Sequence, residues 1–500
     1  MKALAAVRDL ILAYKFGQGA LTDAYFIAFH IPHTLMYVMG ITLLRGMSSS
    51  IFSESIAKKQ YDNLSVIFST IFNAAFIVTA VISIICVWQM PAIIRLLPFT
   101  FQEASFEMIV LMGRILFPLI ITLGLSDYLG ATLNAFRNFF LPGFSMIAAN
   151  ICMILSLIYF ADKLSILSLA YGTAAGFILA CAIQFVFIVR SKIHYKFNSF
   201  NLNLPPVRSF LRKSMPLLLV TGFGQITMLI GYIIALNIEE GMVSALSYAG
   251  KINDISLSLF VLPLLTVLLP EFARDKAANN IDALKSHIRF GAEVIASIIV
   301  LWAAFLIVFH REIIMVYLQR GEFSASDAYL TGKILLIYMI GLCFLAGNLF
   351  LKFIYLGMQK TEALTIIGVI TYTINILLLF VLSKIYGVYG LAWAASITAF
   401  IYCLLLLITF KTKYIQFSLL RHGRNLMKII GAGIIIFLLF NLARSVVITD
   451  TETTTVITAL KLMLIGIFGG IIYMGMLHFF RIFLFDEIFT GIKRYIHGQN

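Results

Sequence analysis

The chain has 500 residues, of which 61% are hydrophobic and only 12% are charged. Soluble globular chains are about half apolar and a quarter charged, so this composition excludes a soluble protein and predicts an integral membrane protein. The formal net charge of +14 would suit a nucleic-acid-binding protein, but the placement of the basic residues argues against that class.

Apolar runs long enough to cross about 30 Å of hydrocarbon recur along the whole chain. They predict an all-α, polytopic membrane protein with about fourteen transmembrane helices. In chain order these are expected at residues 3–16, 24–52, 64–89, 108–135, 140–160, 165–189, 208–237, 242–271, 284–309, 327–357, 360–383, 387–410, 426–446 and 456–480. The alternating pattern of an outer-membrane barrel is not found.

Most lysines and arginines fall in the even-numbered loops and in the C-terminal tail of this topology. Two clusters stand out, one of Arg190, Lys192, Lys196, Arg208, Arg212 and Lys213, and one of Lys411, Lys413, Arg421, Arg424 and Lys428. Cytoplasmic loops of membrane proteins carry such an excess and meet anionic lipid there. We therefore expect a multi-pass protein of the bacterial cytoplasmic (inner) membrane with both termini in the cytoplasm, with membrane lipids and no nucleic acid as partners.

The chain lacks the signatures of a metal site, a disulfide framework or an enzyme. Its five cysteines lie inside apolar helices at unrelated spacings and are expected to be small core residues. They are Cys86, Cys152, Cys181, Cys343 and Cys403. There is no Walker-type loop for ATP and no long loop with acceptor-activating carboxylates. We predict no catalytic residue, no cofactor and no metal.

Two segments of the chain repeat about 220 residues apart. Residues 52–64 are similar to residues 272–284, and residues 113–116 are similar to residues 332–335. The repeat predicts two six-helix lobes, residues 1–190 and 208–410, joined by a cytoplasmic linker at 191–207. Two appended helices and a cytoplasmic tail follow in 411–500. Parallel repeats of this kind occur in alternating-access transporters, with the substrate site between the lobes.

Several cations interrupt the apolar helices. Charges inside the membrane are costly and often mark a substrate path, although a snorkelling or ion-paired structural role is the alternative for each one. Arg8 and Lys251 fall on equivalent helices of the two lobes and are the first candidates to bind a diphosphate, which suits point cations and guanidinium forks. Lys2 and Arg45 are further candidates. Arg114, Lys333 and Lys352 complete the set of intramembrane cations.

The acidic residues support these cations. Asp9 follows Arg8 and is expected to pair with another helix, whereas Asp254 can neutralise Lys251 one turn away. Asp23 is expected either to cap the second helix or to contact substrate. Residues 217–237, 364–383 and 387–410 hold no aspartate or glutamate, so a sodium site in the second lobe is poorly supported.

Several of these motifs resemble those of the MurJ (MviN) family of lipid II flippases, a branch of the multidrug/oligosaccharidyl-lipid/polysaccharide exporter superfamily. The likeness lies in the Arg8-Asp9 pair, the Gly17-x-Gly19 turn followed by Thr22-Asp23-Ala24, and the stretches 130–142, 247–254 and 320–328. The resemblance implies twelve plus two helices and transport of a lipid-linked sugar diphosphate. It places Arg8, Asp9 and Asp23 on charged family positions and substitutes Lys251 for a family arginine.

One position departs from the family. After Ile31-Pro32 the family carries Asn-Leu-Leu-Arg-Arg, and this chain has His33-Thr34-Leu35-Met36-Tyr37. Arg45 lies nine residues further on and faces the opposite side of an ideal helix, so it does not replace the missing arginine. His33 lies about one turn before Met36 and is expected to supply a weaker, titratable donor to the substrate.

The motifs and the resemblance together predict a lipid flippase, not an enzyme. It would carry an undecaprenyl-diphosphate-linked sugar, first of all lipid II for peptidoglycan synthesis, from the inner to the outer leaflet by alternating access. An exopolysaccharide or O-antigen repeat-unit flippase of the same superfamily is the alternative, because the missing arginine leaves the cargo open. The machinery of cell-wall or polysaccharide synthesis is a candidate partner.

Overall fold

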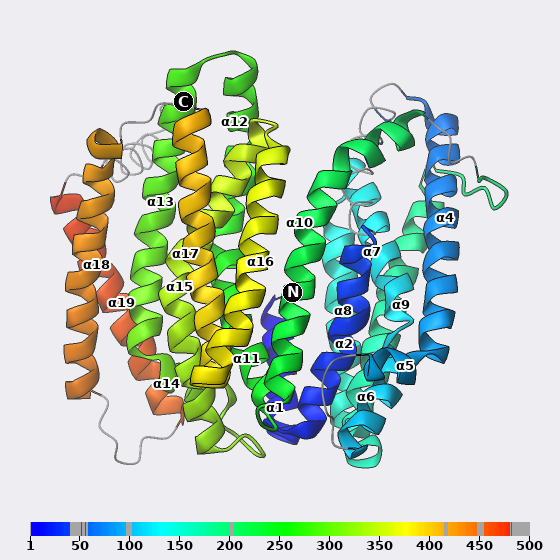
Figure 1. The fold of residues 1–500 in the computed structure, drawn as a ribbon, viewed down its shortest axis with the longest axis horizontal. Coiled ribbons are helices and arrows are strands. Elements are labelled where there is room, and N and C mark those ends of the chain that lie inside the picture. Colours follow the sequence, from blue (N-terminus) through cyan, green and yellow to red (C-terminus); the bar gives the residue numbers. More distant parts are fainter. Residues whose placement is uncertain are drawn as a thin grey trace. The chain divides into compact units, whose positions relative to one another are not determined.

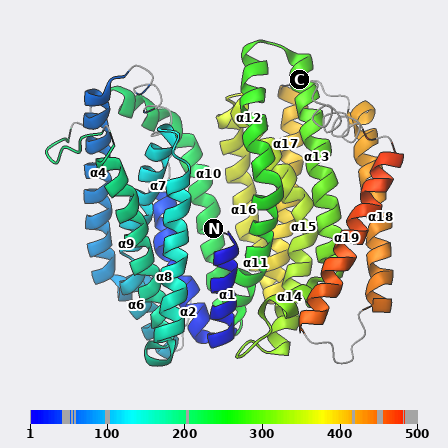
Figure 2. The same cartoon turned by 180° about the vertical axis from the view of Figure 1, so that it is seen from behind.

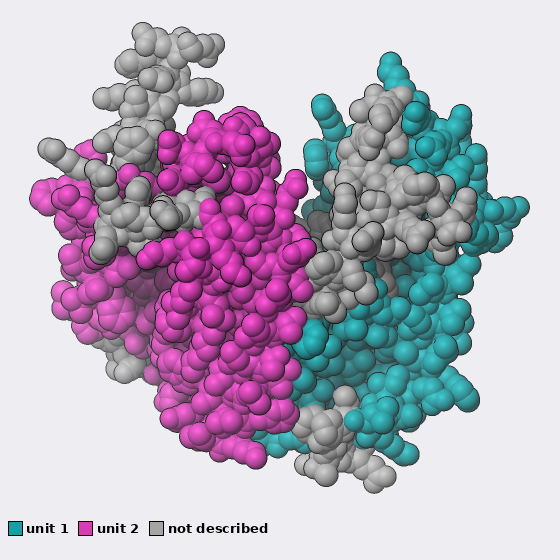
Figure 3. Space-filling model, turned by 45° about the horizontal axis from the view of Figure 1, so that its top comes forward, with its two compact units in different colours: residues 1–244, 320–324 teal, residues 245–319, 325–500 magenta. Residues whose placement is uncertain are grey.

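The structure is a computed structural model that describes residues 2–40, 52, 56, 59–96, 103–191, 193–200, 205–414, 419–447, 455–480 and 482. Within these residues the regular structure is helical, with no β-strand (Figures 1 and 2). The chain divides into two compact units, coloured in Figure 3. Unit 1 comprises residues 1–244 and 320–324, and unit 2 comprises residues 245–319 and 325–500.

Eleven helical segments of the described chain are long and apolar enough to cross a membrane. They confirm the prediction of an all-α polytopic membrane protein. Three predicted spans lie outside this set. They are the first helix, which has only 15 residues, the second helix, and the seventh helix. In the seventh, residues 221–236 form an apolar stretch that is shorter than a membrane span.

Unit 1 contains α1 (Lys2–Phe16), α2 (Ala20–Val38), α4 (Tyr61–Trp88), α5 (Met90–Arg95), α6 (Glu103–Leu116), α7 (Leu119–Ala135), α8 (Phe140–Leu164), α9 (Leu167–Val189) and α10 (Pro205–Leu236). The predicted helix 108–135 is divided into α6 and α7 at Pro118, which cannot donate the hydrogen bond that would continue the helix. The short helix α5 was not expected. It begins next to Pro91, which fits the first turn of a helix.

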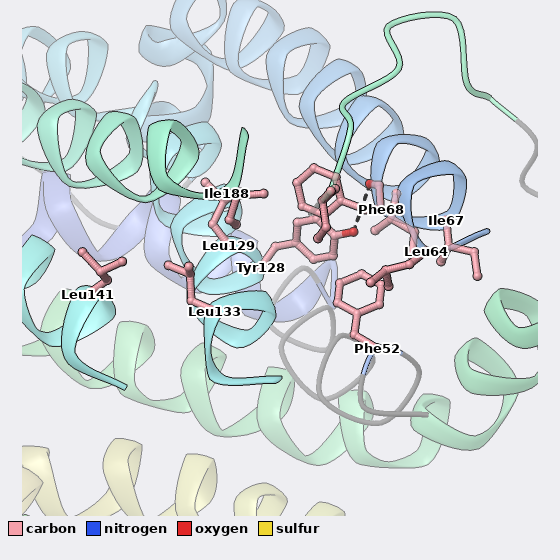
Figure 4. Packing of buried hydrophobic residues seen from close by; sticks show 11 residues of the cluster. Phe52, Leu64, Ile67, Phe68, Tyr128, Leu129, Leu133, Leu141 and Ile188 are labelled. Carbon is pink, nitrogen blue, oxygen red and sulfur yellow. Dashed lines mark hydrogen bonds between the residues drawn. The ribbon is translucent and has the colours of Figure 1, made fainter. Parts of the chain in front are cut away.

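The core of unit 1 joins α4, α7 and the end of α9 (Figure 4). Tyr128 of α7 stacks on Phe68 of α4 with ring centroids 5.5 Å apart, and Phe52 meets the Tyr128 ring edge-on. The buried Tyr128 hydroxyl donates a 3.0 Å hydrogen bond to the backbone oxygen of Phe68. A phenol can lie in an apolar core when its hydroxyl is paired in this way.

Unit 2 contains most of α11 (Met242–Ser256), then the π-helical segment η1 (Leu257–Val261), α12 (Leu262–Ala277), α13 (Ile281–Val308), α14 (His310–Leu318), α15 (Ala325–Gly357), α16 (Thr361–Tyr386), α17 (Val388–Lys413), α18 (Leu419–Val447) and α19 (Thr455–Phe479). The expected helix 242–271 is therefore interrupted near Pro263 and runs on past Pro270 to Ala277. Asn280 begins α13 by accepting a hydrogen bond from the Ala283 N–H.

The last two helices are attached to unit 2 by an apolar core and by two polar contacts. Buried residues of α13 and α14 pack against α18 and α19. Asn425 of α18 donates to the buried Glu293 carboxylate of α13 at 3.0 Å. Arg444, near the other end of α18, pairs with the buried Glu312 of α14 at 2.8 Å. The predicted appended pair is thus fastened at both ends of α18.

The unit boundary falls one helix later than the lobe boundary proposed from the repeat. The helix α10 packs against α2 and belongs to unit 1, and the chain passes into unit 2 within α11. The lobe boundaries drawn from the repeat remain a prediction.

Arg45, a predicted substrate contact, lies outside the described residues.

Candidate functional site: buried polar clusters between membrane helices

Arg8 and Asp9 form an ion pair inside unit 1. Both Nε and Nη2 of Arg8 donate to Asp9 Oδ1, at 3.1 and 2.8 Å. Asp9 is 3% exposed, whereas the Arg8 side chain keeps 21% of its surface accessible. The guanidinium thus folds back onto the neighbouring carboxylate, and the expected pairing of Asp9 with another helix stays a prediction. The predicted cation and acid are brought together on α1.

The second group around Arg8 comes from α8, which packs against α1. Arg8 Nη1 lies 3.4 Å from Asn150 Oδ1 and 3.3 Å from Met153 Sδ. Asn150 is held in turn by its Nδ2 donating to the Met146 backbone oxygen at 2.8 Å. A thioether and a neutral amide are weaker acceptors than a phosphate oxygen, so these contacts can be exchanged for a stronger anionic partner.

Asp23 does not cap its own helix as expected, and its expected contact with substrate stays a prediction. It lies in the first turn of α2, but the N-cap of that helix is Gly19. Its fully buried carboxylate accepts hydrogen bonds from the N–H groups of Gly241 and Ser244, each at 2.7 Å. These groups begin α11, where backbone N–H groups lack helical partners. Asp23 therefore caps α11 and not its own helix.

His33 belongs to a row of aromatic rings along α2. The ring centroids of Tyr25 and Phe29 are 6.2 Å apart, those of Phe29 and His33 are 5.9 Å apart, and those of His33 and Tyr37 are 5.0 Å apart. These residues recur every fourth position and so share one helical face. Met36 is 3% exposed and packs against Ile120, in a cluster that Tyr37 also contacts.

Lys251 lies in unit 2 with a buried ammonium group. Its Nζ is 5.3 Å from the centroid of the Tyr248 ring, which is fully buried. A ring face attracts a cation and offsets part of the cost of removing it from water. Asp254, one turn later, is exposed. Its expected pairing with Lys251 stays a prediction, as does the substrate role of Lys2, which is exposed at the start of α1.

Some buried polar groups were not anticipated from the sequence. The Tyr25 hydroxyl lies 2.9 Å from Thr173 Oγ1 in the interior of unit 1. Glu293 and Glu312 are 3% and 6% exposed, and they hold α18. The sequence did offer a signal for Glu293, because a carboxylate within a membrane-length helix calls for a partner.

One cluster of described side chains could hold a metal ion by residue type and mutual distance. It consists of Glu271, Asp275 and His287. His287 Nδ1 lies 2.6 Å from Asp275 Oδ2, and Arg274 pairs with Glu271. The acids already have basic partners, so this cluster is interpreted as an ion-paired connection between α12 and α13.

The chain has membrane-length helices in two units, with paired charges and polar side chains between the helices. This combination defines a multi-pass membrane transporter. Residues 12–490 match the family described as Lipid II flippase MurJ. The chain therefore belongs to the lipid II flippase MurJ family, a family of transporters and not of enzymes. Membership implies a lipid-linked substrate in the membrane.

Named relatives agree with this assignment. A probable lipid II flippase MurJ of Rickettsia prowazekii (strain Madrid E) is 28% identical over 416 residues, 81% of this chain and 80% of that protein. The one of Rhizobium meliloti (strain 1021) is 26% identical over 412 residues, 81% and 76% of the two chains.

The fold is shared with a lipid II flippase MurJ structure in an inward closed conformation, with a TM-score of 0.77, 24% identity and coverage of 94% and 95%. An inward-facing multidrug resistance MATE family transporter of the MOP superfamily has a TM-score of 0.71 at 13% identity, covering 83% of this chain and 96% of that one.

Proposed function

We propose that this protein flips an undecaprenyl-diphosphate-linked sugar precursor, first of all lipid II, from the inner to the outer leaflet by alternating access. The observation that carries the proposal is the Arg8 cluster. A guanidinium is placed among membrane helices, with one side fixed by Asp9 and the other on Asn150 and Met153. The matching family supports lipid II as the cargo.

In this proposal Arg8 binds one phosphate of the diphosphate. Asp9 holds Nε and Nη2 and so sets the plane of the guanidinium. A phosphate oxygen then takes the place of the weak acceptors at Nη1. Lys251, whose buried ammonium already lies near Tyr248, supplies a second cation. The further candidates for substrate contacts remain Lys2, Asp23, His33 and Arg45.

The membrane placement is part of the proposal. The distribution of lysine and arginine supports the cytoplasmic membrane with both termini inside. A reporter fused after Asn500 that functions only in the cytoplasm should be active, and a reporter that functions only outside should be silent. The enzymes that make and consume the lipid precursor are the proposed partners.

The cargo is tested in vesicles that contain the purified chain. Lipid II and an undecaprenyl-diphosphate polysaccharide repeat unit, each fluorescently labelled, are reconstituted separately, and the fraction exposed to an external reagent is followed with time. We expect protein-dependent movement of lipid II, and Arg8→Gln should abolish it. Movement of the repeat unit alone would make the polysaccharide alternative correct, and movement of neither would refute the flippase proposal.

A further inference from the structure

The segment that follows α9 is held against α4 by a series of side-chain hydrogen bonds. We call residues 193–200 the connector turn; Figures 1 and 2 show it as a loop beside α4. The backbone N–H groups of His194 and Lys196 donate to Ser65 Oγ and Ser69 Oγ, at 3.0 and 2.8 Å. These serines are one helical turn apart, so the connector turn runs along α4 for at least that distance.

Asn73, one turn further along α4, holds the tip of the connector turn. Its Nδ2 lies within 3.3 Å of the backbone oxygens of Lys196, Phe197 and Ser199. The Tyr195 hydroxyl donates to Asn73 Oδ1 at 2.6 Å. Non-helical backbone is tolerated at membrane depth only where its polar groups find partners. One asparagine thus provides hydrogen-bond donors for an irregular turn on a transmembrane helix.

The length of α4 places this tip inside the hydrocarbon. The helix has 28 residues, about 42 Å, and exceeds the hydrocarbon of about 30 Å by about 12 Å, whereas Asn73 is the thirteenth residue, about 18 Å from the start of the helix. Most of residues 64–73 are buried, partly beneath the connector turn. Immediately beyond the tip, Phe76, Ile77 and Val78 are exposed, as expected of side chains that face lipid.

The outward side of the connector turn combines aromatic and basic residues. Ile193 is fully buried, whereas Phe197 and Phe200 are 75% and 51% exposed. His194 and Lys196 are exposed, and so is Arg190 at the end of α9. Exposed phenylalanines beside cations match an interface in which apolar rings enter the acyl region and cations meet anionic headgroups.

We propose that the connector turn is a preformed membrane anchor, which inserts Phe197 and Phe200 into the leaflet and binds anionic phospholipid headgroups through Arg190 and Lys196. The hydrogen bonds from α4 fix the turn in the inserted geometry, so binding does not have to order it. The anchor is independent of the transported lipid, since it lies on the outer side of α4.

The insertion is tested by placing a tryptophan probe at the tip. Phe197→Trp is reconstituted in nanodiscs, and its emission is taken as the difference from the parent chain, which has Trp88, Trp302 and Trp393. We expect blue-shifted emission that is quenched by lipids brominated near the headgroup. The matched control is Asn63→Trp, at an exposed site in the first turn of α4, which should emit as in water. Red, unquenched emission from the probe at position 197 would overturn the proposal.

The choice of lipid is tested with the same Phe197→Trp protein. Brominated phosphatidylglycerol should quench the tip probe more strongly than brominated phosphatidylcholine, and Lys196→Gln should lower this preference about fivefold. Lys163→Gln, at an exposed position at the end of α8, should leave it unchanged. Equal quenching by both lipids would refute the anionic site.

The role of α4 is tested with Asn73→Ala, which should reduce the quenching of the tip probe because the tip of the connector turn loses the amide that contacts three of its backbone oxygens. Tyr195→Phe removes a single hydrogen bond to Asn73 and should give a smaller change in the same direction. Quenching that is unaffected in both variants would show that Asn73 does not hold the tip of the anchor.

Discussion

Asp23 shows how one buried carboxylate can serve a helix far away in the sequence. It is fully buried in the first turn of α2, and both of its oxygens accept backbone N–H groups that begin α11. Hydrogen bonds to a charged acceptor are stronger than neutral ones, and the helix N-terminus adds a favourable dipole. The sequence separation of 218 residues between Asp23 and Gly241 explains why no local pattern revealed this contact.

Asp23→Asn should destabilise the protein by about 2–3 kcal/mol, because the amide keeps one acceptor and presents an N–H₂ group to the other backbone donor. The thermal unfolding midpoint in detergent measures the loss. Asp62→Asn, at an exposed position in the first turn of α4, should change stability by less than about 0.5 kcal/mol. Equal midpoints for Asp23→Asn and the parent chain would contradict the capping role.

Met36 is a core residue, although the resemblance to the family predicts an arginine at this position. It is 3% exposed and lies in an apolar cluster with Ile120. Met36→Arg would place an unpaired guanidinium there and should cost at least about 3 kcal/mol, whereas Met36→Leu should cost less than about 1.5 kcal/mol. Thermal unfolding distinguishes them. A stable Met36→Arg protein with stronger binding of a diphosphate lipid would show that residue 36 faces the substrate.

At the scale of elements, unit 1 joins two of the motifs that resemble the family. The turn between α1 and α2 packs against residues 320–324, where the Glu322 N–H donates to the Tyr14 oxygen at 3.0 Å. Two glycines make this approach possible, Gly17 and Gly321, with φ of 59° and 58°. A Cβ on Gly321 would lie 2.3 Å from the Tyr14 oxygen, closer than atoms can pack.

Gly321→Ala should therefore destabilise unit 1 by about 2 kcal/mol or more, through the strained φ and the collision with backbone. Gly470→Ala is the matched control, because it lies within α19 and a Cβ there would meet open space. That change should be neutral or stabilising. Thermal unfolding of both variants tests the packing, and an unchanged midpoint for Gly321→Ala would refute it.

The apolar runs were sufficient to predict most membrane helices, since length and hydropathy alone determine whether a segment can span. They did not reveal α5 and α14, because both helices are far shorter than a membrane span and polar residues mark their starts, Gln89 before α5 and His310-Arg311-Glu312 in the first turn of α14. The π-helical η1 precedes Pro263, and its form depends on how neighbouring helices pack. Arg8 and Asp9 were found because they are charged residues in an apolar run, whereas Asn150 and Met153 carry no such signal in the sequence.

For the whole molecule, the charge distribution predicts how transport is driven. The expected ion-coupling helices of the second lobe, residues 217–237, 364–383 and 387–410, hold no acidic residue. Flipping should therefore persist without sodium. Reorienting basic sites would respond to voltage, because each charge moved across the membrane senses about 2.3 kcal/mol per 100 mV. Vesicles with a set potential test both points: flipping should fall when the potential is collapsed, and a sodium requirement at constant potential would contradict the first point.

The central claim is that Arg8 binds the diphosphate of the transported lipid, and a comparison of two cations on α1 tests it most directly. Arg8→Gln removes the part-buried guanidinium that contacts α8, whereas Lys15→Gln removes a part-buried cation near the end of α1 that pairs with the exposed Asp162 at 2.8 Å. Both variants are reconstituted in equal amounts, and lipid II binding and flipping are measured. The account predicts a ten- to hundredfold loss of affinity for Arg8→Gln, from about 1.5–3 kcal/mol of charge-assisted bonding, and parent-like behaviour for Lys15→Gln. Parent-like affinity and flipping by a folded Arg8→Gln protein would contradict it.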